Sequence, residues 1–433
     1  MTAPDLYPPD IVSVAVGFTV NPNSTADGAM FLNDPTKGLL GTGTLGGTAF
    51  HVSVTDDIRK ISIRRGASRA DSPLIRYEAT TGAIVLDNSG RKYDPTNLAG
   101  PYVSGGVTQV EPMRPIIVSA IWDGVDYPLA TTYTDSWDID WAGPNWSEAT
   151  AAFTDAFRVL EEDKRQAVAA VGSGETSGAR IHRILDSVGW PADKRAIDPG
   201  DVTLQATTLE GPALTELQAV ADAELGALYI RGDGVLVFQE RTAVMTDPRS
   251  TTSQATFGDG GGSELPYKDG GLGLSYDTAT LINRVIAQRE GGTEVMVEDL
   301  ASQEKYLVHS PVSASDLLLE TDSAVSDWAT YLLTVSRAPE LRFTSMEVWP
   351  RVDPERLWPQ VLGREIGDRI TVIRRPPGGG DPIVRDVIIR GIEHEITPDN
   401  WVTRWTFQPA TKFAFLVLNA DPGGRLDQNA LAF

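Results

Sequence analysis

Short apolar segments separated by turn residues dominate the first 145 residues of the chain. Ile11 to Val20 is β-branched and apolar, Ala83 to Leu86 leads into the turn Asp87-Asn88-Ser89-Gly90, and Ile116 to Ile121 ends at Trp122-Asp123-Gly124. Short strands punctuated by glycine, asparagine and aspartate are typical of β-barrels and β-sandwiches. We therefore expect residues 1–145 to form an N-terminal β-domain.

Helical periodicity first appears between residues 146 and 256. Apolar residues at positions 181, 184, 185 and 188 follow the i, i+3, i+4, i+7 spacing of one buried helix face, and Ser177 is the expected N-cap. A second helix is expected from Pro212 to Gly226, followed by a hairpin whose turn is Arg231-Gly232-Asp233-Gly234. This order predicts an α+β insert domain over residues 146–256.

Strands are predicted to return after the glycine-rich stretch Asp259 to Ser263. One helix is expected around Trp328 and another from Pro354 to Gly363, and strands at 370–373 and 384–389 are expected to pair. The pattern gives a second β-domain with one helix (257–350), C-terminal strands that complete the β-domains (351–412) and a flexible tail (413–433). The whole chain is thus expected to be mainly β with α+β insertions.

One pair of segments resembles an internal repeat. Ile58 to Arg65 aligns with Ile282 to Arg289 at constant spacing, and Lys92-Tyr93 then aligns with Lys305-Tyr306. A true duplication would give two related β-domains separated by the insert. Because β-rich chains also repeat such patterns by chance, both interpretations stay open.

Composition excludes several classes of function. The chain has no Cys, which excludes disulfides and thiolate nucleophiles, and its four His residues (His51, His182, His309, His394) are far apart in sequence. Its 37 basic and 59 acidic residues give a net charge of −22, the opposite of the basic surface of a nucleic-acid binder. Neither a signal peptide nor an apolar stretch long enough to cross a membrane is evident.

Two motifs resemble known catalytic signatures but lack essential residues. Gly172 to Gly178 is rich in glycine, yet it lacks the Lys that a phosphate-binding loop needs before its Ser or Thr. His394-Glu395 lacks the second His of a zinc protease, because Pro398 occupies that position. We interpret the first motif as the entry to a helix and the second as part of a strand.

The segment Asp135 to Trp141 is the strongest catalytic candidate. Strand alternation predicts Trp137, Ile139 and Trp141 on one face, and Asp138 and Asp140 on the other face, about 7 Å apart. Two carboxylates at such a separation could serve a glycosidase. Paired Asp residues on an open strand face are more often solvated, so we expect no catalytic, cofactor or metal site in this chain.

Several stretches together resemble the minor tail proteins of siphophages that infect actinobacteria. They cover most of residues 50 to 410, and none is a catalytic signature. The matching stretches are Ile61 to Gly66, Ala83 to Asn88, Arg91 to Pro95, Pro112 to Pro115, Thr154 to Phe157, Ser177 to Asp186, Gly189 to Pro191, Gly363 to Ile370 and Gly391 to Pro398.

The resemblance implies a structural protein of the virion, a tail-tip or baseplate hub made in the host cytoplasm. Such hubs form a ring, commonly a homotrimer, whose two tube-like β-domains per chain match a six-fold tail tube. The implied partners are a distal tail protein, a tape-measure protein and tip fibre or spike proteins. DNA would pass through the ring without specific binding, which agrees with the acidic composition.

Three alternatives remain at this point. A hexameric distal-tail ring would contain one tube-like domain per chain. A cell-wall hydrolase would use Asp138 and Asp140 in a cleft. A carbohydrate-binding tip protein would use some of the ten Trp residues as stacking platforms.

Overall fold

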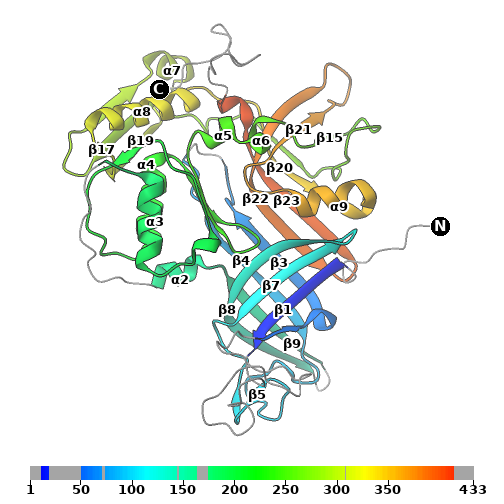
Figure 1. Cartoon of the computed structure of the whole chain (residues 1–433). Helices are drawn as coiled ribbons and strands as arrows, with labels where there is room; N and C mark the ends of the chain where they lie inside the picture. Colours follow the sequence, from blue (N-terminus) through cyan, green and yellow to red (C-terminus); the bar gives the residue numbers. More distant parts are fainter. Residues whose placement is uncertain are drawn as a thin grey trace.

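The fold is mainly β, with one large sheet and several short helices (Figure 1). A computed structural model describes residues 11–18, 50–70, 74–143, 146–162, 174–307 and 309–413. The predicted turn-rich stretch Asn21 to Gly47, residues 172–173 and the predicted tail beyond residue 413 lie outside these ranges. The mainly β prediction is confirmed, but the described strands of the large sheet follow an open order that does not close into a barrel.

Thirteen strands form the large sheet in the order β16-β20-β23-β22-β3-β4-β9-β8-β7-β1-β2, with β21 beside β22 and β15 beside β21. All neighbours pair antiparallel except β15 and β21. The strands are β1 (Val12–Phe18), β2 (Phe50–Ser53), β3 (Ile58–Gly66), β4 (Glu78–Asp87), β7 (Pro115–Trp122), β8 (Val125–Gly143), β9 (Trp146–Thr154), β15 (Thr256–Gly258), β16 (Leu272–Ser275), β20 (Arg342–Val348), β21 (Arg369–Arg374), β22 (Ile383–Thr397) and β23 (Asn400–Pro409).

Smaller sheets and eight α-helices complete the described part of the chain. The small strands are β5 (Val103–Ser104) with β6 (Val107–Thr108), β10 (Glu175–Thr176) with β12 (Thr203–Leu204), β11 (Arg195–Ile197), β14 (Leu236–Gln239) and β13 (Ala227–Ile230) in one sheet, and β18 (Val295–Glu298), β17 (Arg284–Arg289) and β19 (Pro311–Leu317) in another. The helices are α2 (Phe157–Glu162), α3 (Ser177–Ser187), α4 (Ala213–Glu224), α5 (Ala243–Thr246), α6 (Pro248–Thr251), α7 (Leu300–Tyr306), α8 (Asp322–Ser336) and α9 (Pro354–Gly363).

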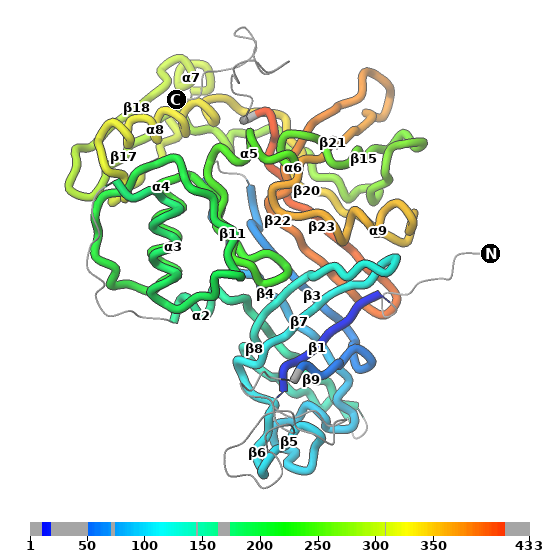
Figure 2. Tube along the Cα trace, in the orientation of Figure 1, coloured from blue at the N-terminus to red at the C-terminus, as the bar shows by residue number. Residues whose placement is uncertain are grey.

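The described residues bury two hydrophobic cores, and the hairpin β13–β14 separates them. The first core lies against the large sheet, and the second lies among α2, α3, α4, α8 and the small sheets that contain β10 to β14 and β17 to β19. Figure 2 shows these helices grouped beside the large sheet. Tyr229 and Val237 of the hairpin point into the first core, whereas Leu228 and Phe238 point into the second. Strand alternation therefore makes one hairpin a wall shared by both cores.

Most predicted local elements are confirmed. Helices α3, α4, α8 and α9, the hairpin β13–β14 and the pairing of β21 with β22 appear where the periodicity placed them. One detail is wrong: Thr176, and not Ser177, caps α3, because its Oγ1 accepts the backbone N–H of Ala179 at 3.3 Å. Ser177 is instead buried and donates to Glu224 at 2.8 Å.

The aligned segments of the possible internal repeat occupy different environments. Strand β3 lies between β22 and β4 in the large sheet, whereas β17 lies in a small sheet beside the parallel strand β19. Tyr93 is buried in a loop of the first core, but Tyr306 ends a helix. The alignment is therefore not a structural repeat, while the predicted domain boundaries stay a prediction. Among the described helices, none has the length and apolar character needed to span a bilayer.

Candidate functional site: the open face and the central joint

One side of the large sheet is polar and carries the acidic residues singled out in the sequence. Along β9, Ser147, Ala149, Ala151 and Phe153 are buried, so Glu148 and the alternate residues that follow it face the other side. We call this side, as presented by β8, β9, β4, β3, β22, β23 and β20, the open face.

Carboxylates from three neighbouring strands lie side by side on the open face. Asp140 of β8 is opposite Glu148 of β9, and Glu148 is opposite Asp87 of β4. Arg59 contacts Asp87 at 2.6 Å, and its guanidinium lies 5.6 Å from the ring centroid of Trp146. The pKa of Asp87 is lowered, first by the hydrogen bond from the backbone of Ser89 and further by Arg59. These strands therefore present a negatively charged row.

Cations on the other half of the open face are each paired with a carboxylate. Lys60 contacts Glu395 at 2.5 Å across β3 and β22, and Arg64 contacts Glu78 at 3.1 Å. Glu347 accepts from both Lys268, at 2.6 Å, and Arg404, and Arg404 also contacts Glu393 at 3.6 Å. Cross-strand pairs of opposite charge stabilise a sheet modestly. Here they also cancel the positive charge of these four side chains.

The predicted catalytic pair lies exposed on this face. Asp138 and Asp140 are both exposed, and Asp138 accepts a hydrogen bond from Ser136 Oγ at 2.9 Å. The predicted opposite face is confirmed for Trp137 and Ile139, which pack against the first core. Trp141 lies near the end of β8, where the strand continues beyond the first core, and its side chain is 62% exposed.

The four His residues do not converge. His51, His182 and His309 are exposed, whereas His394 of β22 is buried. Its Nδ1 lies 2.9 Å from Thr403 Oγ1, and burial lowers its pKa to about 3. Within the described ranges, no cluster of His, Asp and Glu could hold a metal ion. The described end of the glycine motif, Gly174 to Gly178, leads into α3 as predicted.

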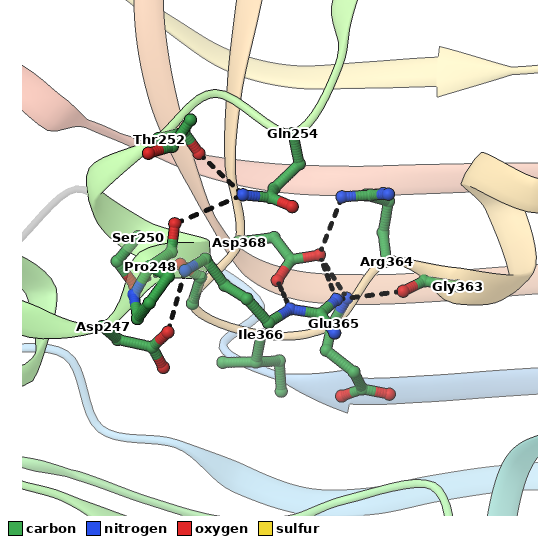
Figure 3. Close-up of polar contacts among 12 residues, drawn as sticks. Asp247, Pro248, Ser250, Thr252, Gln254, Gly363, Arg364, Glu365, Ile366 and Asp368 are labelled. Carbon is green, nitrogen blue, oxygen red and sulfur yellow. Dashed lines mark hydrogen bonds and ion pairs between the residues drawn. The ribbon is translucent and has the colours of Figure 1, made fainter.

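Sequence reasoning did not find one densely paired polar cluster of the fold. The loop of residues 364–368, between α9 and β21, contacts β3, β13, β22 and α6, and we call it the central joint (Figure 3). Glu365 accepts two hydrogen bonds from Arg65 of β3, at 2.8 and 3.0 Å, and the Arg65 side chain is only 3% exposed. Tyr229 of β13 donates to the carbonyl of Ile366 at 3.3 Å.

Asp368 is the most connected residue of the central joint. Its carboxylate accepts two hydrogen bonds from Arg249 of α6, at 2.5 and 2.6 Å, and one from Arg364 at 3.3 Å (Figure 3). Ser250 Oγ donates to the carbonyl of Gly367 at 2.7 Å. The hydrogen bonds to Asp368 raise the pKa of Arg249, whereas burial lowers that of Arg364. The joint thus fixes α6 and β13 against the large sheet.

The fold is similar to that of two solved tail proteins. The tail protein from Neisseria meningitidis MC58 shares 14% identity with a TM-score of 0.56, over 92% of this chain and 96% of that chain. The 43 kDa tail protein of prophage MuSo2 from Shewanella oneidensis shares 12% identity with a TM-score of 0.52, over 92% and 98%. No protein-family model matches the sequence, and no curated protein matches it either. At such identities the likeness establishes a shared fold.

Proposed function

We propose that this chain is a structural protein of a phage tail tip, a hub ring that joins the tail tube to the tip fibres or spike and encloses the DNA channel. The observation that carries the proposal is a fold shared with two tail proteins over 92% of this chain and nearly the whole of theirs. Similarity over whole chains supports a common assembly role better than similarity confined to one module does.

The open face is the surface that we assign to the channel. Its acidic row would repel DNA phosphates, and its cations already have carboxylate partners, so a passing duplex meets no unpaired charge from Lys60, Arg64, Lys268 or Arg404. Small residues such as Ala83, opposite Ala152, leave the middle of this surface smooth. A wall of this kind lets DNA slide without specific contacts.

The proposed ring is a homotrimer with two tube-like units per chain. The two halves of the large sheet, which meet where β3 pairs with β22, would supply these units. On either side of that pair lies a hairpin, β3–β4 or β22–β23. The antiparallel β3–β22 pair makes the two hairpins topologically equivalent, so three chains could match six-fold symmetry.

Electron cryomicroscopy of isolated tails tests the ring directly. We expect three copies around a central pore, with the distal tail protein and the tape-measure protein as neighbours. A six-fold ring would instead indicate the hexameric distal-tail position. Density found only at the periphery would refute the channel role and favour the carbohydrate-binding alternative.

Charge reversal on the open face tests the channel wall. Particles that carry Asp138→Lys, Asp140→Lys and Glu148→Lys together should assemble normally but eject DNA more slowly, because the new cations would hold phosphates. The matched control places Lys at Asp193, Glu294 and Glu304, three exposed acidic residues outside the large sheet. Equal ejection rates for the two triple variants would contradict the assignment.

The hydrolase alternative has its own test. Host peptidoglycan is incubated with the purified protein and with the Asp138→Asn, Asp140→Asn variant. We expect no release of soluble fragments by either protein. Release by the unmodified protein that the double variant loses would establish an enzyme.

A further inference from the structure

We infer that the body built on the second core, residues 156–251 and 282–336, pivots on the large sheet, and that surface ion pairs between the two act as latches. The two parts have separate cores and share the hairpin β13–β14, and from the sheet side Leu74, Ala79 and Tyr133 also pack against the second core. An interface held by few apolar contacts and several charge pairs is typical of parts that move relative to each other.

Two cavities flank the shared hairpin. One, of about 530 Å³, lies between α4 and α8 on one side and Arg390 and Gln408 of the sheet on the other. The second, of about 320 Å³, lies between Phe238 of the hairpin and the central joint. Both cavities open to solvent and are lined in part by the hairpin. The hairpin therefore has room on both sides into which the body can tilt.

Three Arg–Asp pairs hold the body to the sheet around this pivot. Arg158 of α2 pairs with Asp135 of β8 where the chain leaves the sheet. Arg76, just before β4, pairs with Asp222 of α4 at 2.9 Å on the rim of the larger cavity. The third is the Arg249–Asp368 pair of the central joint, on the segment where the chain returns to the sheet.

The first two pairs have the properties of latches. The side chains of Arg76 and Asp222 are 68% and 48% exposed, and those of Arg158 and Asp135 are 36% and 24% exposed. Exposed pairs of this kind contribute little energy each and are screened by salt. They can open without unfolding either core. The third pair is buried at its Asp368 end and keeps the pivot in place.

The absence of Cys from the sequence allows a clean measurement of this motion. Spin labels are attached to Cys at His182 on α3 and at Asp126 on the β7–β8 hairpin, both of which are exposed. A second, control pair at Asp126 and Asp399 spans only the large sheet. Pulsed electron paramagnetic resonance then gives the distance distribution between each pair of labels.

High salt, and variants that remove the latch pairs, should change only the distance distribution between the labels at positions 182 and 126. Raising the ionic strength from about 0.1 M to about 1 M shortens the Debye length from about 10 Å to about 3 Å. We expect this change to shift and broaden the His182–Asp126 distribution, and the double variant Asp135→Asn, Asp222→Asn to do the same at low salt.

The control variant Asp193→Asn removes an exposed charge that forms no ion pair between the described parts of the body and the sheet, and it should leave the distribution unchanged. An unaltered His182–Asp126 distribution, in high salt and in the double variant alike, would overturn the inference. So would an equal change between the two labels of the sheet, because that result would indicate general loosening.

Discussion

Replacement of Asp368 by Asn tests whether burial decides the strength of the ion pairs in this fold. The Asp368 side chain is 2% exposed and receives hydrogen bonds from Arg249, Arg364 and the backbone of Glu365. An amide keeps one acceptor oxygen but turns its NH₂ group toward a guanidinium donor. The change thus leaves at least one donor of the central joint unpaired and removes the carboxylate charge that is ion-paired with both Arg249 and Arg364.

The expected cost follows from the exposure of each partner. Removal of one member of a fully buried pair costs about 3–5 kcal/mol. The Arg249 side chain is 48% exposed and is partly stabilised by water, whereas Arg364 is 14% exposed. We therefore take the lower end of that range, about 3 kcal/mol, which corresponds to a folding equilibrium constant lower by about 100-fold.

The assay is urea unfolding followed by tryptophan fluorescence, to which ten Trp residues contribute. The matched control is Asp386→Asn. Asp386 also accepts hydrogen bonds from two nitrogens of one Arg side chain, that of Arg369. In this pair, however, the Asp386 and Arg369 side chains are 32% and 30% exposed. The control should cost about 1 kcal/mol or less. Equal losses in the two variants would refute the claim that burial makes the central joint strong.

Three further changes have defined outcomes. Gly232→Ala should destabilise the protein by about 1–3 kcal/mol in thermal unfolding, since a Cβ there would lie 2.3 Å from the Pro128 carbonyl oxygen. Gly90→Ala should be nearly neutral, because its Cβ would make only an ordinary contact, at 3.9 Å, with Lys92 Cγ. Burial raises the pKa of Asp155 to about 6, so this group destabilises the fold progressively as pH rises from about 4 to 6, by up to about 3 kcal/mol. Asp155→Asn should abolish that part of the pH dependence, and an unchanged slope would contradict it. His394 has the opposite effect on the pH dependence of stability. Its lowered pKa of about 3 favours the neutral ring in the folded state, so stability is lost as pH falls below about 6.5. His394→Gln should flatten this acid limb, and parallel pH profiles of the variant and the unmodified protein would show that His394 does not cause it.

Local patterns in the sequence predict the elements whose partners are close along the chain. The hairpin around Arg231 to Gly234 and the strands joined by the turn after Arg374 form as expected, because each pairs with its next neighbour. Helix α9 begins at Pro354 and ends at Gly363, where a first-turn proline and a terminal glycine predicted it.

The features that the sequence did not predict depend on contacts between segments that are far apart in the chain. Strand β17 has the apolar alternation of any half-buried strand. That alternation does not determine whether β17 joins the large sheet or, as observed, a small sheet beside α8. Arg65 and Glu365 are 300 residues apart, so their contact has no local pattern to reveal it. The acidic residues Asp138 and Asp140 were found, but Glu148 and Asp87 join them only through strand register.

The pairing of β3 with β22 also has a consequence for biosynthesis. Gly66 pairs with Gly391, so a ribosome must add 325 residues after β3 before its partner exists. At about 5–20 residues per second this takes roughly 16–65 s. The second core, whose residues all lie between Ala156 and Leu333, can be complete by then. Strand β3 meanwhile offers an unpaired edge to other nascent chains. Yield in the host should therefore depend on chaperones that cover this edge during synthesis.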